Sequence, residues 1–252
     1  MLRARDTSFQ TFVGLALAIV ILACWIGLHG YALFAFDLTW ATLPLAIPMV
    51  AVLCWLSVGL FIVSHDAMHG SLMPGSARVN TAVGTALVFL YAGFSYDKLR
   101  AAHWAHHKAP GTAHDPDFAA DHPRSFWLWY ATFLRRYFGL GSLAYVIGVF
   151  WALVALGAPI GQVLLFYAVP SIASSLQLFY FGTFRPHRHA EDSFADRHNA
   201  RSDDFGTLAS FLTCFHFGYH LEHHHHPHVP WWALPAARRE ASAGRVEEGA
   251  GA

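Results

Sequence analysis

Long apolar runs without charged residues dominate the pattern of hydrophobic and polar positions along the chain. Residues 12–31, 38–63, 138–157 and 160–184 each contain such a run. A helix needs about 20 mostly apolar residues to cross a bilayer, so each run is predicted to be a membrane span. Residues 79–94 are also apolar, but this run is shorter and is interrupted by glycine, which favours a re-entrant or interfacial helix. The pattern therefore predicts an all-α integral membrane protein with four transmembrane helices in two hairpins.

The polar parts of the chain are predicted to gather on one side of the membrane. Residues 64–137 and 185–235 would form a histidine-rich helical cap, followed by a flexible tail at residues 236–252. Four spans bring all 16 Lys and Arg residues to the side of the N-terminus, which carries Arg3 and Arg5. By the positive-inside rule, that side faces the cytoplasm. Residues 1–252 are interpreted as a single domain without internal repeats.

Composition excludes several classes of protein. Hydrophobic residues make up 55% of the chain and charged residues only 13%, about half the share in soluble proteins. Such a chain is not disordered, and its zero net charge argues against nucleic-acid binding. The three cysteines, Cys24, Cys54 and Cys214, have the spacing of neither an iron–sulfur cluster nor a zinc ribbon.

Histidine is the exception in this composition, with 18 residues, several of them in clusters on the predicted cytoplasmic side. One cluster has the spacing HxxxH and two have the spacing HxxHH, which brings the first and last imidazoles of each cluster to one helix face. Clustered neutral imidazoles are typical of a transition-metal site. The candidate ligands are His65, His69, His103, His106, His107, His187, His220, His223 and His224. Nine ligands are too many for one ion and fit two ions with four or five each. Iron, zinc, copper and nickel all accept such ligands, so ligand type leaves the metal open.

Five further side chains are candidates to support these ligands through hydrogen bonds. Carboxylates commonly accept the free N–H of a ligand imidazole, a role open to Asp66, Asp117 and Glu222, and also to Asp115. A loop turn explains Asp115 and Asp117 equally well, and a solvated helix face explains Glu222. His216 lies one turn before His220 and could support the site or ligate.

The remaining histidines are expected to be less important. In the sequence FRPHRH, His187 is preferred over His189 because it is closer to the preceding span. The second HxxHH box is followed directly by His225, His226 and His228. A helix presents only part of a consecutive run to one side, and proline then ends this helix, so these three histidines are expected to face outward. The histidines expected to lie outside the ligand set are His29, His114, His122, His198, His225, His226 and His228.

The clusters and their flanking residues resemble those of a known family. An HxxxH box followed by two HxxHH boxes is similar to the membrane fatty-acid desaturase and hydroxylase superfamily of non-haem di-iron enzymes. Within it, the chain resembles the bacterial β-carotene 4-ketolases, or carotenoid 4,4′-oxygenases, over residues 10–235. The segments that carry the resemblance are HDAMHGSL (65–72), HWAHHKAPGTAHDPDF (103–118), FYFGTFRPHRH (179–189) and FHFGYHLEHHHHPHVPWW (215–232).

The resemblance implies two iron ions held by the nine histidines, in a bacterial inner membrane with the active site in the cytoplasm. It implies an oxygenase that uses O₂ to convert the C4 methylene of a β-ionone ring to a ketone, by two hydroxylations and a dehydration. β-Carotene would then give echinenone and canthaxanthin, and zeaxanthin would be converted toward astaxanthin. The chain departs from related desaturases at Thr183, one turn before His187. Related desaturases carry an Asn at the matching position.

The expected partners follow from this chemistry. Each cycle consumes electrons, and the sequence has no flavin motif, haem-binding domain or cluster of cysteines. A separate electron donor is therefore expected, such as a ferredoxin with its reductase. Lys98, Arg100, Arg135 and Arg136 are candidates for its docking surface, or for contact with anionic membrane lipid. The carotenoid is expected against the aromatic-rich spans, and no substrate-contacting residue is singled out.

Two other functions remain open. A fatty-acid desaturase or a carotenoid ring hydroxylase could use the same metal site, and only its product would distinguish it. A membrane metal transporter would need ligands or charges within its spans, because intramembrane ionisable residues mark ion pathways. The four predicted spans carry almost no charge between their ends, which favours an enzyme.

Overall fold

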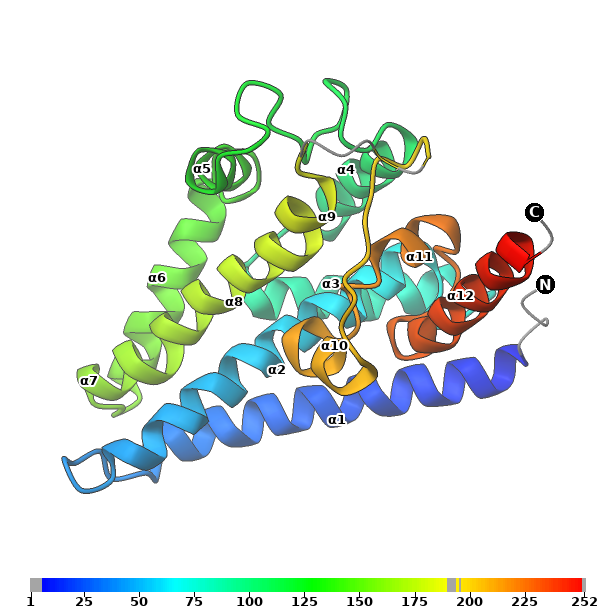
Figure 1. Cartoon of the computed structure of the whole chain (residues 1–252). Helices are drawn as coiled ribbons and strands as arrows, with labels where there is room; N and C mark the ends of the chain where they lie inside the picture. The colour runs from blue at the N-terminus through cyan, green and yellow to red at the C-terminus, as the bar shows by residue number, and fades with distance from the viewer. Residues whose placement is uncertain (1–5, 190–193, 195, 251–252) are drawn as a thin grey trace.

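Every regular element is a helix in the part of the chain that the computed structural model describes, which is residues 6–189, 194 and 196–250, with the backbone alone for 244–250. This confirms the predicted all-α fold (Figure 1). The first six helices are α1 (Thr7–Phe34), α2 (Leu43–His69), α3 (Ala77–Ala92), α4 (Tyr96–Lys108), α5 (Phe126–Tyr137) and α6 (Leu140–Ala155). Those that follow are α7 (Ile160–Val163), η1 (Leu164–Ala168), α8 (Val169–Phe179), η2 (Tyr180–Phe184), α9 (Arg185–His187), α10 (Thr207–Cys214), α11 (His220–His225), η3 (Trp231–Ala233) and α12 (Leu234–Ala250).

Helices α1 and α2 form a long antiparallel hairpin whose ends are set by local sequence. The Asp6 carboxylate accepts a hydrogen bond from the Ser8 backbone N–H at 2.8 Å and so caps α1. Pro44 occupies the first turn of α2, where its missing N–H costs nothing, and so begins this helix. Gly70 ends α2 with a φ of 74°, directly after His69. The HxxxH box is therefore the last turn of a membrane-length helix.

The third long rod runs without interruption from Ile160 to His187 and comprises the elements α7 to α9. It contains two π-helical turns, η1 and η2, and each is followed after one residue by a proline, Pro170 and Pro186. Since proline lacks an N–H, the helix cannot keep its regular hydrogen bonds there, and the π-turns lie where that regularity is lost. The rod extends three residues beyond the predicted end of the fourth span.

The two remaining apolar segments are bent. Helix α6, within the predicted span 138–157, has only 16 residues, and α5 meets it at an angle of 89°. The segment predicted as re-entrant or interfacial forms α3, and α4 follows it at 101°. Among the described residues, three helices are long and apolar enough to cross a membrane, or up to five if each bent pair crosses as one span. The arrangement of four spans therefore remains a prediction.

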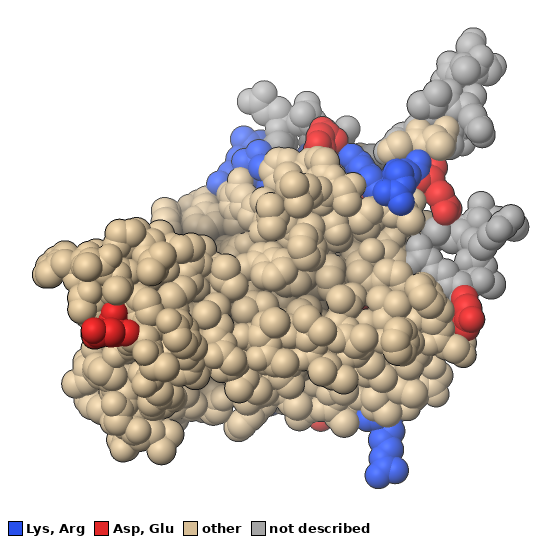
Figure 2. All heavy atoms as spheres, turned by 90° about the horizontal axis from the view of Figure 1, so that it is seen from below, with Lys and Arg blue, Asp and Glu red and all other residues tan. Residues whose placement is uncertain are grey.

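One face of the molecule carries few charges, as expected of a surface in contact with lipid. Figure 2, which looks at the molecule from the side of α1, shows a broad face without charged side chains, with Lys, Arg, Asp and Glu mainly near its edges. Along α1, Phe12 is 72% exposed and Ile19 is 66% exposed. Large apolar side chains exposed in this number indicate a membrane-facing surface.

Helix α2 lies at the centre of the fold, packed against α1, α3 and α8. The stretch Phe215–His216, between α10 and α11, crosses it with φ values of 49° and 62°, a left-handed backbone that side chains other than glycine rarely adopt. The Phe215 ring stacks on Trp55 with a centroid distance of 4.2 Å. A side chain at Gly59 would lie 2.7 Å from that ring, so glycine is required there.

Helix α12 runs from Leu234 to Ala250 and so includes most of the segment predicted as a flexible tail. The Arg238 guanidinium binds the carboxylate of Glu222 at 2.8 Å and that of Asp204 at 3.0 Å. These ion pairs fasten the start of α12 to α11 and to the loop before α10. Arg3 and Arg5, and residues 251–252 at the end of the predicted tail, lie outside the described residues.

Two glycines of α1 test how closely this helix has to approach its neighbours. A Cβ at Gly14 would lie 2.7 Å from the Leu72 carbonyl oxygen, whereas a Cβ at Gly27 would meet nothing within 4 Å. Gly14→Ala is expected to lower the free energy of unfolding by about 1–3 kcal/mol, because backbone has to move. Gly27→Ala is expected to leave it unchanged or raise it. Thermal unfolding in detergent measures both, and equal midpoints for the two variants would contradict the close packing of α1.

Candidate metal centre

The nine histidines predicted as ligands come together from four separate parts of the chain. His65 and His69 lie one turn apart at the end of α2, and His187 is the last residue of the long rod. Helix α4 contributes three histidines and the short helix α11 three more. Helices α4, α9 and α11 lie near one another at the same end of the molecule (Figure 1).

These side chains form two separate groups, within each of which the potential ligand atoms lie within 4.8 Å of one another. The five-histidine group consists of His65, His69, His103, His107 and His223. The four-histidine group consists of His106, His187, His220 and His224. Two ions with five and four imidazole ligands would fit these groups.

The distances between ring nitrogens match those of ligands around a shared ion. In the five-histidine group, His103 Nε2 lies 2.7 Å from His69 Nε2 and 3.1 Å from His107 Nε2. In the four-histidine group, His220 Nε2 lies 2.9 Å from that of His187 and 3.1 Å from that of His224. Nitrogens about 2.1 Å from one ion lie about 3.0–3.4 Å apart.

The hydrogen bonds on the far sides of the rings show which nitrogen is available to a metal. His106 Nδ1 donates to Asp115 Oδ2 at 2.9 Å, and His187 Nδ1 donates to the Asn199 carbonyl oxygen at 2.8 Å. A neutral imidazole has a single N–H, so in the neutral form of both rings the Nε2 atom carries a bare lone pair toward the group centre. His65 Nε2 is buried without a hydrogen-bond partner among the described residues. The residues therefore fit a pair of bound cations.

Burial also favours the form of histidine that binds metal. In α11, burial lowers the pKa of His220, His223 and His224 well below the usual value, and the neighbouring imidazoles lower it further. These rings are neutral at physiological pH. Neutral imidazole is the metal-binding form, because a protonated ring has no free lone pair.

Asp115, rather than Asp117, accepts the hydrogen bond from a ring of the centre. Burial raises the pKa of Asp115, but hydrogen bonds from His106 and from the backbone N–H groups of Gly111 and Asp117 outweigh it, so that the pKa lies below its usual value. Asp117 lies 3.8 Å from His106 Nδ1 and accepts a hydrogen bond from the Tyr137 hydroxyl. The carboxylate that fixes the His106 tautomer is therefore Asp115, one of the two aspartates of this loop that the sequence offers for the role.

The other predicted supporting residues have different partners. The Asp66 carboxylate accepts the Trp231 backbone N–H at 3.1 Å, and Glu222 binds Ser202 and Arg238. His216 packs parallel to the Tyr219 ring with a centroid distance of 5.9 Å and belongs to neither group. These contacts lie around the centre, and the supporting role of these side chains toward ligand imidazoles stays a prediction.

The choice between His187 and His189 is clear in the geometry. His189 Nε2 donates to the Gly111 carbonyl oxygen at 3.1 Å, and its ring stacks on Phe118. Only His187 reaches the four-histidine group. The hydrogen bond from His187 to the Asn199 carbonyl oxygen was not predicted, because a backbone acceptor in a distant loop leaves no signal in the sequence.

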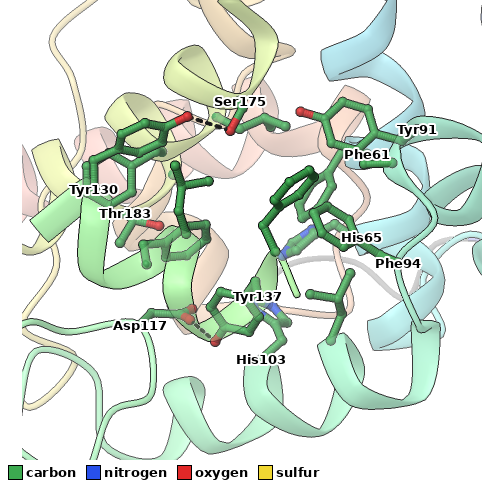
Figure 3. A pocket seen from close by; sticks show the side chains of 18 of the residues that line it. Phe61, His65, Tyr91, Phe94, His103, Asp117, Tyr130, Tyr137, Ser175 and Thr183 are labelled. Carbon is green, nitrogen blue, oxygen red and sulfur yellow. Dashed lines mark hydrogen bonds between the residues drawn. The ribbon is translucent and has the colours of Figure 1, made fainter. Parts of the chain in front are cut away.

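A cavity of about 380 Å³ adjoins both groups. Its wall contains His65 and His103 from the five-histidine group and His106 and His220 from the four-histidine group. In Figure 3, His65 and His103 lie near the Tyr137–Asp117 hydrogen bond, and the Tyr130–Ser175 hydrogen bond lies at the opposite end. Apolar side chains line most of the remainder, among them Phe61, Met68, Phe94, Leu99, Phe133, Leu134, Ile172, Leu178 and Phe217. A long apolar molecule could therefore reach both groups from this side.

Comparison with known proteins agrees with this arrangement. The family model for fatty acid desaturases matches residues 38–146 and 138–251, more than half of the chain. The chain belongs to the fatty acid desaturase family.

The chain is also similar to known ketolases. It is 49% identical to a beta-carotene ketolase of Paracoccus sp. (strain PC1) over 245 residues, and this alignment covers 94% of this chain and 97% of the relative. It is 51% identical over 221 residues to a beta-carotene ketolase of another Paracoccus strain, covering 86% and 89%. A zeaxanthin 4-ketolase of Chlamydomonas reinhardtii is 36% identical over 248 residues, 94% of this chain and 55% of the relative. The resemblance to the ketolases is confirmed.

The contact between Asp115 and His106 predicts a loss of metal on mutation. Asp115→Asn removes the charge that holds the His106 Nδ1–H, and such a loss typically weakens metal binding by about 10- to 100-fold. The measurement is the metal content after dialysis against a graded chelator. Asp121→Asn, an exposed carboxylate of the same loop, is the matched control and is expected to retain its metal. Equal retention in the two variants would refute the supporting role of Asp115.

The lowered pKa values of α11 predict how the metal-free protein responds to acid. Unfolded histidine takes up a proton below about pH 6.5, whereas His220, His223 and His224 resist protonation in the fold. Their contribution to stability is therefore complete above about pH 6.5 and decreases as the pH falls. The thermal midpoint of chelator-treated protein should decline between about pH 7 and about pH 5. A midpoint that stays level or rises over this range would contradict their burial as neutral rings.

Proposed function

We propose that this protein is a β-carotene ketolase, which oxidises the C4 methylene of a carotenoid β-ionone ring to a ketone with O₂. The observation that carries the proposal is an apolar cavity whose wall includes imidazoles of both histidine groups. The similarity to ketolases over nearly the whole chain supports the choice of substrate. Both β-carotene and its 3-hydroxylated relative zeaxanthin are candidate substrates.

Two iron ions bound by the nine histidines would supply O₂ activation and the oxidation of the C4–H bond. The protein holds their ligands in fixed tautomers, through Asp115 for His106 and through the Asn199 carbonyl for His187. Its apolar wall excludes water from the reacting carbon, which protects reactive species from side reactions. Phe61 and Phe94 would contact the substrate close to His65 (Figure 3).

The ketone would form in two rounds of oxidation at the same carbon. Each round inserts one oxygen atom into a C4–H bond, and the other atom of O₂ leaves as water with two electrons and two protons from a separate donor. Loss of water from the doubly hydroxylated carbon then gives the ketone. A ferredoxin with its reductase is the proposed donor. The proposed orientation in a bacterial inner membrane puts the N-terminus and the centre on the cytoplasmic side, where such a donor is available.

Expression in bacteria that accumulate β-carotene tests the proposed reaction. The extracted pigments are expected to gain the mass of one oxygen atom less two hydrogen atoms per ring, measured by chromatography with mass spectrometry. His223→Ala is expected to abolish this product, because it removes a ligand candidate of the five-histidine group. The matched control is His228→Ala, an exposed histidine of the same cluster, which should leave the product unchanged.

Other products would point to other enzymes. A gain of a full oxygen atom per ring would identify a ring hydroxylase, and unchanged pigment with a new acyl double bond would identify a desaturase. Unchanged pigment and lipid in cells that contain the inserted protein and a donor would contradict the proposal. Metal uptake by vesicles that hold the purified protein would then support a transporter.

A further inference from the structure

A third cluster of metal-binding side chains lies outside the two histidine groups. Asp196 and His198 belong to the loop between α9 and α10, and His225 is the last residue of α11. One oxygen or nitrogen atom from each of the three side chains lies within 4.8 Å of the other two. The side chains of His225 and Asp196 are 39% and 32% exposed, so the cluster is open to solvent.

The local geometry holds these side chains in a convergent arrangement. Asp196 Oδ1 accepts the backbone N–H of His198 at 2.8 Å, which fixes the carboxylate. Its second oxygen, Oδ2, lies 2.5 Å from His225 Nε2. The His198 and His225 rings lie 5.0 Å apart at a steep angle of 69°. The three side chains can therefore approach one ion without rearrangement of the backbone.

We propose that Asp196, His198 and His225 bind a divalent transition-metal ion at the surface, in addition to the two ions of the buried centre. Two imidazoles and one carboxylate are a ligand set that zinc, iron, nickel and copper accept. Partial exposure leaves the remaining coordination positions to water. Without a metal ion, Asp196 Oδ2 and His225 Nε2 are joined by a hydrogen bond, which an ion bound between them would replace.

The position of the site gives it a consequence for the whole protein. The His198 ring lies 5.8 Å from the ring of His224, a member of the four-histidine group. The third ion would thus lie directly beside the buried centre and on its solvent side. Where free zinc or nickel is present, the chain would hold three ions rather than two.

Metal counting on the iron-loaded protein tests the site. The protein, in detergent and without a polyhistidine tag, is dialysed against graded Zn²⁺ near neutral pH, and bound zinc and iron are measured by elemental analysis. The wild type is expected to bind one zinc ion per chain in a saturable step while its iron content stays constant. Asp196→Asn and His198→Ala are each expected to weaken this step at least tenfold. The double variant His226→Ala/His228→Ala keeps the three ligands but removes neighbouring histidines, and it is expected to bind zinc as the wild type does.

Iron content separates loss of the site from loss of the fold. A variant that retains its iron but not the zinc step supports the proposal. Should His198→Ala lose iron through its contact with His224, the isosteric Asp196→Asn variant provides the decisive measurement. The proposal is overturned if the wild type has no saturable zinc step, or if the step persists in Asp196→Asn with iron retained. It is equally overturned if the step disappears in the His226→Ala/His228→Ala variant, because the zinc would then be bound by these neighbouring histidines instead.

Discussion

The convergence of nine imidazole rings at one place, six of them buried and three half-buried, is the constraint on which the rest of this structure depends. Each neutral ring has one N–H and one bare lone pair. Within each group the ring nitrogens lie about 3 Å from one another, and they cannot satisfy one another with so few protons. Buried lone pairs without partners are costly, whereas a cation satisfies several at once. The ends of α2, α9 and α11 and the face of α4 therefore converge on positions that a metal ion makes favourable. Metal binding and the packing of these helices are in this sense one process.

The spacing HxxHH acquires a physical meaning from this arrangement. In α4, the first and third histidines of the box, His103 and His107, lie one turn apart and serve the five-histidine group, and the middle one, His106, serves the four-histidine group. In α11 the roles are exchanged, since His220 and His224 serve the four-histidine group while the middle histidine serves the other. Each box therefore bridges both groups. A helix presents residues three and four apart at neighbouring angles, so one short helix can support two adjacent ions.

The sequence predicts the helices and the ligand set better than it predicts the surroundings of the centre. Apolar length alone identifies α1, α2 and the long rod, because membrane spans have few other solutions. The predicted span 138–157 begins where α5 ends, but hydropathy does not record the 89° turn between α5 and α6. His106 could be recognised from its box, but the choice of Asp115 over Asp117 depends on a loop geometry that the DPD sequence leaves open. Asp66 and Glu222 lie within the histidine boxes, where a supporting carboxylate is expected. In the structure, Asp66 accepts a backbone N–H and Glu222 binds an arginine.

Phe217 lies between the two histidine groups and the cavity, whose wall it helps to form. Its ring packs edge-on against His65 of the five-histidine group at 4.7 Å and against His220 of the four-histidine group at 5.0 Å. On the other side, a Cβ at Gly182 would lie 2.7 Å from the same ring, so the long rod can approach only because this position is glycine. Gly182 belongs to the π-helical turn that also carries Thr183 into the cavity wall. One aromatic ring therefore determines how closely the rod, both groups and the cavity approach one another. The shape of the cavity and the positions of the histidines are for this reason not independent of each other.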